Sequence, residues 1–381
     1  MRQLLKDLAV ICAGQGAPQG DNNYCENGTP FVKAGNLQEL LEGKAITSIQ
    51  KVSDEVAKKH KLKLYPKGTI LFAKSGMSCM KGYVYVLPQS AYVVSHLACV
   101  TPNEDASEYL RYFFNYHKPN QLVKDAAYPS ISLSDIGNLV VDMKSESERN
   151  AIVSVLQHAE SVITLRQKEL QKLDDLVKAR FVELFGGIHD SKMYPYKLVN
   201  DLTDVISGGT PSRDVNEYWE GGTIPWVKTT ELQNNYVTEV EEYITEEGLN
   251  NSSAKIVPAG TVLIAMYGQG KTRGMTAYLG IEACTNQACA CILPSDKINQ
   301  TFLWQFFVLS YDNLRDRAKG GNQPNLNGNI IKNYPVLYPP IELQEQFAAF
   351  VKQTDKSKVV VQKALDEAQT LFESLMQEYF G

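Results

Sequence analysis

The stretch of this sequence that comes nearest to a known catalytic motif is Ala265–Thr272, AMYGQGKT. It resembles the phosphate-binding loop GxxxxGK[ST], in which backbone N–H groups and a lysine hold the phosphates of a nucleotide. Ala265 replaces the first glycine, however, and Arg273-Gly274 interrupts the helix that should follow. The corresponding part of the first half of the chain has no GK[ST] run at all. We therefore do not expect nucleotide binding.

Other catalytic motifs are also missing from the sequence. An amino-methyltransferase needs [ND]PP[YF], which Tyr338–Ile341 (YPPI) does not match, and no Pro-Asp dipeptide exists for a PD…ExK nuclease. Cys284, Cys289 and Cys291 lack a nearby histidine and the spacing of a zinc site, which favours buried cysteines over metal ligands. The five histidines form no catalytic constellation. We expect no catalytic residues and no metal ligands, and hence a protein that is not an enzyme by itself.

The sequence contains an internal repeat of two similar copies. Pro30–Leu37 (PFVKAGNL) recurs 195 residues later as Pro225–Leu232 (PWVKTTEL), and Lys67–Ala73 (KGTILFA) recurs 192 residues later as Ala259–Ala265 (AGTVLIA). The offset of 195 also relates two further pairs: Tyr128–Ile131 with Gln323–Leu326, and Phe185-Gly186 with Phe380-Gly381. Such constant offsets over nearly 200 residues indicate an internal duplication.

Most of each copy has the texture of a mixed α/β domain. Short runs rich in Val, Ile and Tyr, separated by Gly and Pro, predict strands. Two short stretches between them predict helices. The predicted strands are Thr69–Ala73, Gly82–Leu87, Ala91–Val94 and Thr261–Met266, and the predicted helices are Ser107–Asn115 and Gln300–Leu309.

The last part of each copy predicts a long helix with a coiled-coil seam. Residues 145–185 contain no Gly or Pro, and mostly apolar residues alternate spacings of four and three. In the first copy the seam is Ile152, Leu156, Ala159, Ile163, Arg166, Leu170, Leu173, Val177, Arg180 and Leu184. Adding 195 gives Phe347, Val351, Thr354, Lys358, Val361, Leu365, Ala368, Phe372, Leu375 and Tyr379.

A helix of this length spans about 60 Å, longer than the domain before it. A single such helix is as often packed on its own domain, but two copies favour mutual pairing. The order domain, helix, domain, helix then requires the second helix to run back along the first. We predict an α+β protein with pseudo-twofold symmetry, in which two antiparallel helices separate two tandem α/β domains. The predicted boundaries are 1–144, 145–187, 188–340 and 341–381.

Composition excludes several classes of protein. The 381 residues carry a formal net charge of −5, whereas a non-specific nucleic-acid binder is normally basic. No apolar run approaches the length of a membrane span, and Met1-Arg2 does not open a signal peptide. Seven scattered cysteines suit a reducing compartment. We expect a soluble, cytoplasmic protein.

Three motifs resemble one family, the specificity (S) subunits of type I restriction-modification enzymes. Ile206–Ser212 (ISGGTPS) followed by Tyr218–Lys228 (YWEGGTIPWVK) resembles the opening of a target-recognition domain. Ile341–Phe347 (IELQEQF) resembles the start of that family's spacer helix, and Glu148–Ile152 is a weaker copy. The resemblance covers the whole chain. The first copy departs from it at Ala13–Pro18, which replaces the GGTPS run.

The resemblance implies a non-catalytic DNA-specificity subunit. Residues 1–144 and 188–340 would be target-recognition domains, each reading one half of a bipartite site in double-stranded DNA. The spacer helices, 145–187 and 341–381, would set the gap and dock two DNA methyltransferase (modification) subunits, which restriction/translocase subunits join. S-adenosylmethionine, ATP and Mg would belong to those partners. The acidic balance then fits, because the partners would supply much of the phosphate binding.

Loops that follow strands are the best candidates for reading bases. In the second copy, Tyr267–Gly274 follows an apolar strand, and its Gln and Arg or Lys types can bond adenine and guanine. In the first copy the matching stretch is Lys74–Gly82, with different chemistry. Polar pairs inside two apolar strands, Asn286-Gln287 and Ser95-His96, match at an offset of 191. These pairs are equally suited to bonding DNA or a loop backbone.

Lysines are assigned to phosphate contact. Lys33 and Lys228 occupy equivalent positions in the repeat, and Lys319 opens a Gly-Gly-Asn run. Ordinary surface lysines are the competing interpretation. The full set of predicted DNA-binding residues is Lys33, Asn36, Lys74, Ser75, Lys81, Ser95, His96, Ser207, Thr210, Ser212, Lys228, Thr230, Tyr267, Gln269, Lys271, Arg273, Asn286, Gln287, Lys319 and Asn322.

A second function class stays open. The same duplication would suit a tandem-repeat protein-interaction scaffold that binds proteins or peptides and reads no DNA. The variable polar loops in equivalent positions favour DNA reading, although solvated turns with incidental charge would look similar.

Overall fold

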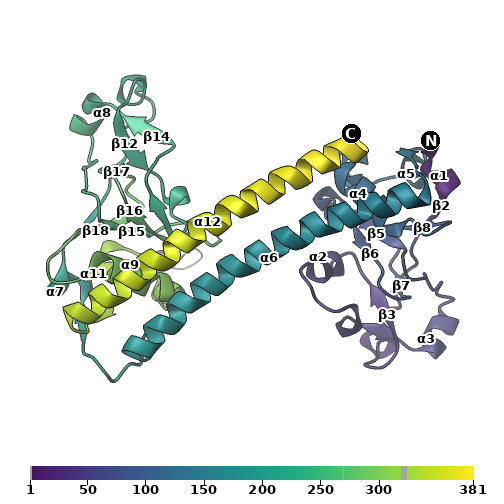
Figure 1. Ribbon diagram of the computed structural model, residues 1–381, viewed down its shortest axis with the longest axis horizontal. Helices are drawn as coiled ribbons and strands as arrows, with labels where there is room; N and C mark the ends of the chain where they lie inside the picture. Colours follow the sequence, from purple (N-terminus) through teal and green to yellow (C-terminus); the bar gives the residue numbers. More distant parts are fainter. Residues whose placement is uncertain (1, 269, 319–323) are drawn as a thin grey trace. The chain divides into compact units, whose positions relative to one another are not determined.

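Two 40-residue helices, α6 (Glu146–Phe185) and α12 (Ile341–Phe380), contribute to both halves of the protein (Figure 1). The computed structural model describes residues 2–268, 270–318 and 324–381. These residues form two compact units, one spanning the chain up to Arg166 together with Lys363–Gly381, the other spanning Gln167–Gln362. Each unit therefore contains one globular domain and one segment of each long helix.

The domain of the first unit is built on a four-stranded antiparallel sheet with the strand order β2-β8-β5-β6. A three-stranded sheet, β4-β3-β7, and a two-stranded sheet, β1-β9, complete it. The strands are β1 (Arg2–Leu4), β2 (Ala9–Ala13), β3 (Thr29–Val32), β4 (Lys51–Val52), β5 (Ile70–Ala73), β6 (Tyr85–Val86), β7 (Tyr92–Val93), β8 (Leu97–Pro102) and β9 (Val140–Asp142). The helices are α1 (Leu5–Leu8), α2 (Asn36–Leu41), α3 (Asp54–Lys59), α4 (Ser107–Tyr116) and α5 (Leu133–Gly137), with 3-10 helices η1 (Asp21–Asn23), η2 (Ile46–Ser48), η3 (Met77–Lys81) and η4 (Pro119–Leu122).

The domain of the second unit repeats this plan with a five-stranded sheet, β11-β18-β15-β16-β13, a three-stranded sheet, β14-β12-β17, and the pair β10-β19. Its strands are β10 (Tyr196–Leu198), β11 (Val205–Ser207), β12 (Ile224–Val227), β13 (Asn235–Val237), β14 (Glu242–Ile244), β15 (Val262–Ala265), β16 (Thr276–Leu279), β17 (Cys284–Thr285), β18 (Cys289–Ile292) and β19 (Pro335–Leu337). Its helices are α7 (Val199–Leu202), α8 (Glu246–Asn250), α9 (Gln300–Leu309), α10 (Tyr311–Asp316) and α11 (Gly328–Lys332), with η5 (Asn216–Tyr218) and η6 (Thr229–Glu231).

Strand register confirms the duplication. Ile70 pairs with Val100 across β5 and β8, and Val262 pairs with Ile292 across β15 and β18. Both members of the pair are shifted by 192 residues, so the same hydrogen-bonded ladder is built twice. The four predicted strands are present, although Gly82–Leu87 narrows to β6 and Ala91–Val94 narrows to β7. The two predicted short helices are present as α4 and α9.

The long helices pair with each other in antiparallel fashion inside each unit. In the first unit Ile152 near the start of α6 shares a core with Phe380 at the end of α12. In the second unit the ring of Phe181 near the end of α6 lies 5.5 Å from that of Phe347 near the start of α12. All twenty predicted seam positions are buried or half-buried. The predicted fold class is therefore confirmed.

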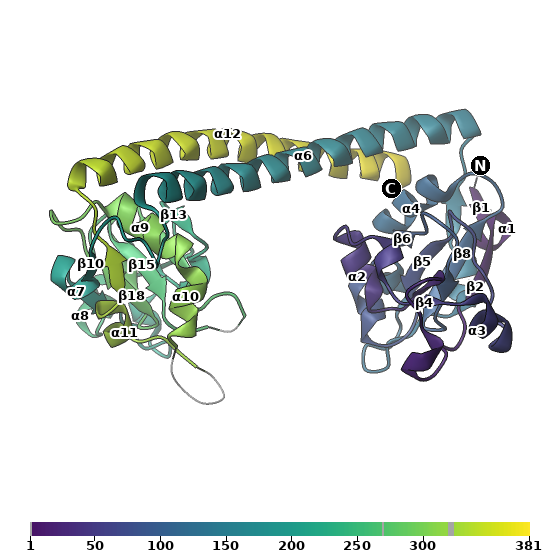
Figure 2. The same ribbon diagram turned by 90° about the horizontal axis from the view of Figure 1, so that it is seen from below.

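Residues of the helix seam contact the globular domains as well as the other long helix. In Figure 2, α9 lies between its sheet and the helix pair of the same unit. There Phe302 of α9 stacks on Phe181 with ring centroids 5.8 Å apart and lies 5.2 Å from Phe185. In the second unit α6 thus has two apolar partners, α12 and α9, and its seam residues there are buried or half-buried.

Local chemistry fixes the ends of these helices. Ser145 and Glu148 form a reciprocal capping box at the start of α6, with the Ser145 N–H donating to Glu148 Oε2 over 2.9 Å. Gly186, with φ of +77°, ends the helix in the left-handed conformation that glycine adopts readily. Among the described residues, no helix is both long and apolar enough to cross a membrane.

Candidate nucleic-acid interface

The candidate loops leave β5 and β15 through the same backbone framework in both units. In the first unit the Lys74 N–H donates to His96 O (2.9 Å), and the Ile131 N–H donates to Lys74 O (2.8 Å). Three segments, the end of β5, the β7–β8 turn and residues 129–131, are thereby joined. Sequence reasoning selected the first two segments and left out the third.

The second unit repeats this framework with other residues. The Met266 N–H donates to Ala288 O (2.8 Å), and the Leu326 N–H donates to Met266 O (3.0 Å). Met266 corresponds to Lys74, and Ala288 to His96, both at an offset of 192. The scaffold is thus constant while the side chains that it presents differ.

This framework corrects the alignment of the two polar pairs. The Val94 N–H donates to Val32 O and the Asn286 N–H to Val227 O, so Asn286 is equivalent to Val94. Gln287 is then equivalent to Ser95, and the predicted offset of 191 was wrong by one residue. The pairs also lie in the turns between strands, not inside strands as predicted. Hydrogen-bond register, which sequence similarity does not report, decides the correct match.

In the first unit these segments gather a polar cluster. Ser75 Oγ lies 2.8 Å from His96 Nδ1, and Ser75 forms an isolated β-bridge with Ser130. Lys74 and Ser95 lie beside them and are half-buried, whereas His96 is exposed. Lys81 is farther along the loop, where its Nζ donates to Gln38 Oε1 over 3.2 Å. Four of the five predicted residues of this region therefore come together.

Two further residues, Tyr128 and Ser130, belong to the segment beside this cluster but are not among the predicted DNA-binding residues. Tyr128 is 82% exposed and directly precedes the segment that joins Lys74. Its segment had already been matched to Gln323–Leu326 in the repeat, so the duplication itself was a signal that could have found it.

In the second unit the predicted residues have unequal roles. Lys271 and Gln287 are exposed, and Tyr267 is 41% exposed. Arg273 instead donates to the backbone carbonyl of Pro324, which makes part of its guanidinium a structural group. Asn286 Oδ1 is buried without a hydrogen-bond partner in the described structure. Gln269, Lys319 and Asn322 lie outside the described residues.

The Gly-Gly-Thr-Pro-Ser run is held by two tryptophans. Trp226 Nε1 donates to Gly209 O (2.9 Å) and Trp219 Nε1 donates to Ser212 O (3.0 Å). A Cβ on Gly208 would lie 2.2 Å from Thr285 O, so only glycine fits there. The side chains predicted to bind DNA here, Ser207, Thr210 and Ser212, are exposed or half-buried.

Gly14 explains how the first copy manages without this run. A Cβ on Gly14 would lie 2.2 Å from Val94 O. The close approach of the end of β2 to the turn between β7 and β8 is therefore kept, although the tryptophans are absent from that copy.

The two equivalent lysines differ in electrostatic environment. Lys33 Nζ donates to the neutral Gln50 Oε1 (2.6 Å), whereas Lys228 Nζ lies 2.6 Å from Glu241 Oε2 and 3.0 Å from Glu242 Oε1. The hydrogen bonds that the Lys228 ammonium donates to those two carboxylates raise the pKa of Lys228. Arg213 also pairs with Glu242 over 2.6 Å, so two cations face two carboxylates.

The backbone N–H groups of these lysines explain two neighbouring residues. Asn36 Oδ1 accepts from the Lys33 N–H (2.9 Å) and Glu231 Oε1 accepts from the Lys228 N–H (2.8 Å). Asn36, predicted to bind DNA, thus uses its amide oxygen as a turn cap. Thr230 is exposed beside the second of these turns.

Comparison with known proteins identifies the family. The profile of the type I restriction modification DNA specificity domain matches residues 3–175 and again residues 194–368. The chain belongs to the type I restriction-modification DNA specificity family. Each specificity domain match contains one globular domain and most of the long helix that follows it.

Named relatives agree with this assignment. The chain is 31% identical over 172 residues to the type I restriction enzyme MjaIX specificity subunit of Methanocaldococcus jannaschii, covering 43% of this chain and 38% of the relative. It is 24% identical over 163 residues to the EcoR124I/EcoR124II specificity subunit of Escherichia coli, covering 42% and 40%. The matched part therefore spans about two fifths of these curated relatives.

Solved structures share the fold over the whole chain. The S subunit of a type I restriction-modification system from M. genitalium superposes with a TM-score of 0.60 at 14% identity, covering 100% of this chain and 96% of that one. A chain from a study of complex assembly of the type I R-M system gives a TM-score of 0.59 at 15% identity, with coverage of 100% and 97%.

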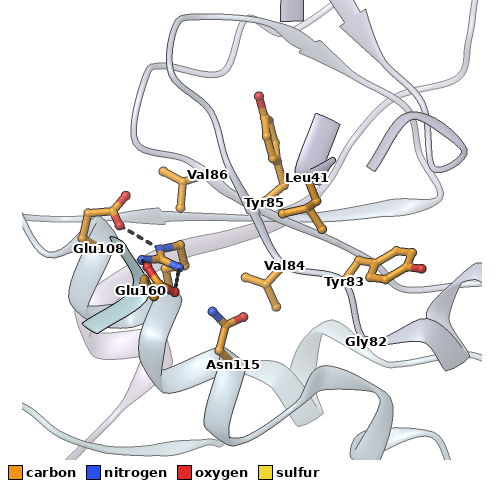
Figure 3. Close-up of a pocket in the computed structure, with 10 residues that line it drawn as sticks. Leu41, Gly82, Tyr83, Val84, Tyr85, Val86, Glu108, Asn115 and Glu160 are labelled. Atoms are coloured by element: carbon orange, nitrogen blue, oxygen red, sulfur yellow. Dashed lines mark hydrogen bonds and ion pairs between the residues drawn. The ribbon is translucent and has the colours of Figure 1, made fainter. Parts of the chain in front are cut away.

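In the first specificity domain a pocket marks the join to the long helix (Figure 3). It has a volume of about 450 Å³ and lies between β6, α4 and α6. Arg111 of α4 bonds Glu160 of α6 through both terminal nitrogens (3.1 and 2.9 Å) and Glu108 through Nε (2.8 Å). Burial opposes the charge of Arg111, but its bonds to Glu160 outweigh this and raise its pKa. The ion pair between Arg111 and Glu160 in the pocket wall thus joins the specificity domain to α6.

The lysine environments lead to a prediction for DNA affinity. Lys33→Gln is expected to reduce the steepness of log affinity against log salt by about one unit, because the phosphate contact predicted for Lys33 would be lost. Lys228→Gln is expected to change the slope much less, since its charge is already balanced by Glu241 and Glu242. Binding of the assembled complex to DNA, measured between low and physiological salt, compares the two variants. Equal slopes for both would contradict the prediction.

Proposed function

We propose that this chain is the DNA-specificity subunit of a type I restriction-modification complex. Each specificity domain reads one half of a bipartite site in double-stranded DNA. The long helices set the gap between the halves and dock two DNA methyltransferase subunits, which restriction/translocase subunits join. Family membership and the two domain matches support this proposal.

One observation carries the proposal of bipartite reading. The same backbone framework appears twice, yet it presents Lys74, Ser75 and His96 in one domain and Tyr267 and Gln287 in the other. A duplicated scaffold with unlike polar side chains is what recognition of two different half-sites requires. Imidazole, hydroxyl and amide groups supply donors and acceptors that base edges in the major groove can discriminate.

The subunit itself is proposed to be non-catalytic. We place S-adenosylmethionine, ATP and Mg on the partner subunits, and the assembly in the cytoplasm. No group of three or more potential metal ligands occurs among the described side chains. The chain's acidity supports the assignment of much of the phosphate binding to partners, because phosphate contacts position a protein whereas base contacts specify the sequence.

The test is selection of DNA by the reconstituted complex with its methyltransferase subunits. A duplex pool with two randomised half-sites and a varied gap is bound, recovered and sequenced. A bipartite consensus is expected from the unaltered complex. The double variant Ser75→Ala/His96→Ala is expected to relax one half of the consensus, and Gln287→Ala the other half.

The matched control is Lys58→Ala, an exposed position on α3. This variant should return the unaltered consensus. If the unaltered complex selected no sequence, the proposal would fail and a protein-interaction scaffold would replace it. If both variants relaxed the same half, the assignment of one half-site to each domain would be wrong.

A further inference from the structure

The loops that follow β5 and β15 have the same length and the same glycines at their ends. We call residues 76–82 and the described residues of 268–274, which leave out Gln269, the glycine-bounded loops. Gly76 and Gly268 open them with φ of +75° and +141°, and Gly82 and Gly274 close them with φ of +63° and +87°. All four angles lie where side chains other than glycine are strained. Both loops are related by the offset of 192 that relates the preceding strands.

In the second unit, side chains of helix α10 donate hydrogen bonds to backbone carbonyls of the glycine-bounded loop. Arg315 Nη1 donates to Arg273 O (2.6 Å) and lies 3.4 Å from Lys271 O, while Nη2 donates to Gly270 O (2.9 Å). The Tyr311 hydroxyl, one turn earlier on α10, donates to Lys271 O (2.6 Å). Two side chains of one short helix thus contact three backbone carbonyls of the loop, and these contacts involve none of the loop side chains.

In the first unit, η4 occupies the equivalent place. Asn120 Nδ2 donates to Met80 O over 3.1 Å, again a loop carbonyl. Asn120 and Arg315 are separated by 195 residues, the offset that also relates Pro129 to Pro324 farther along the chain. The same role is therefore filled from the same position of the repeat by a different side chain.

The closing glycines give an independent sign of this equivalence. A Cβ on Gly82 would lie 2.8 Å from Asn120 Oδ1, and a Cβ on Gly274 would lie 3.0 Å from Arg315 Cγ. In both units the anchoring side chain occupies the space that the missing Cβ leaves. Loop length, end glycines and anchor position have been kept together, although the residues between the glycines differ.

We propose that Asn120 and Arg315 are equivalent positioning residues that fix the backbone of the glycine-bounded loops and thereby determine how sharply each domain discriminates its half-site. The inference rests on the proposed function and adds residues to it that need not touch DNA. Residues 77–81 form the 3-10 helix η3, whereas residues 270–274 contain no helix or strand. Backbone that is mobile before binding loses entropy when it is ordered on DNA. Anchoring its carbonyls beforehand removes that cost and holds the base-reading side chains in one geometry.

Arginine is suited to the larger task in the second unit. Its planar fork reaches several carbonyls at once, whereas a lysine ammonium is a point charge on a flexible stem. Arg315→Lys keeps the positive charge but loses the fork. It therefore separates anchoring of the loop from general attraction to phosphate.

The experiment measures discrimination at each half-site separately with the reconstituted complex. Binding to the selected target is compared with binding to duplexes carrying one substituted base pair in either half. Because one mismatch typically costs about 1–3 kcal/mol, which is roughly 5-fold to 160-fold in affinity, the unaltered complex has a measurable preference to lose. Arg315→Lys and Tyr311→Phe are expected to reduce discrimination several-fold in one half. Asn120→Ala is expected to do so in the other half.

The control is Arg317→Lys, a like change at the end of α10 whose guanidinium lies over the Tyr334 ring. It should leave discrimination in both halves intact. Amide hydrogen exchange on the DNA-free complex supplies a second readout. Exchange in residues 270–274 should rise in Arg315→Lys and Tyr311→Phe and stay unchanged in Arg317→Lys.

Outcomes distinguish the inference from the proposed function. No sequence preference in the unaltered complex would remove the proposed function. Preference that survives undiminished in Arg315→Lys, Tyr311→Phe and Asn120→Ala would overturn the positioning role alone. Equal losses in both halves from a single variant, or unchanged exchange of the loop, would also overturn it, because a general loss of stability would then explain the result.

Discussion

Removing one heptad from each long helix is expected to abolish recognition of the original gap and to create recognition of a shorter one. The deletion takes out residues 164–170 of α6 and 359–365 of α12, which leaves the spacing of the remaining seam residues in phase. Seven helical residues correspond to about 10 Å of helix, or about three base pairs of DNA at 3.4 Å each. The reconstituted complex should therefore select a gap changed by about three base pairs with both half-sites unaltered.

The control deletes the heptad from α6 alone. The two seams then differ in length, so that one antiparallel pairing, such as Phe181 with Phe347, can be kept only at the expense of the other. We expect this variant to lose binding at every gap length. Selection of the original gap by the double deletion would show that the helices do not set it.

Phe181→Ala is expected to cause the largest loss of stability from a single substitution. The Phe181 ring is fully buried, stacks on Phe302, and meets Phe185 and Phe347 edge-on at 4.9 and 5.5 Å. Its removal leaves a cavity where α6, α9 and α12 meet. Truncation of a buried Phe to Ala typically costs about 3–5 kcal/mol in the free energy of unfolding. Urea denaturation followed by circular dichroism would measure the change.

Leu176→Ala is the matched control on the same helix. Leu176 is 48% exposed and lies outside the seam. Its loss should change the free energy of unfolding by about 0.5 kcal/mol or less. Comparable losses in the two variants would contradict the view that the aromatic cluster of Phe181, Phe185, Phe302 and Phe347 joins the helices to the second domain.

The candidate site was predictable only in part from the sequence. The strand-following loops and the polar turns were found because the repeat places unlike polar residues at matched positions. The local contacts of single side chains are not visible in such a pattern. Arg273, predicted to bind DNA, donates to the Pro324 carbonyl. Lys228, predicted to contact phosphate, lies beside Glu241 and Glu242, which balance its charge.

The sequence by itself determined the duplication, the two long helices and the family, because these depend on periodic or local patterns that one chain carries along its length. Apolar spacings of three and four fix which face of α6 and α12 is buried, whatever that face meets. Only the tertiary structure decided three features. It showed that Asn286 is equivalent to Val94 in the other copy and that two glutamates balance the charge of Lys228. It also showed that Asn120 and Arg315 bind loop carbonyls. These features depend on hydrogen bonds between segments far apart in the chain. Every residue has a backbone carbonyl, so the sequence does not indicate which carbonyls accept these bonds.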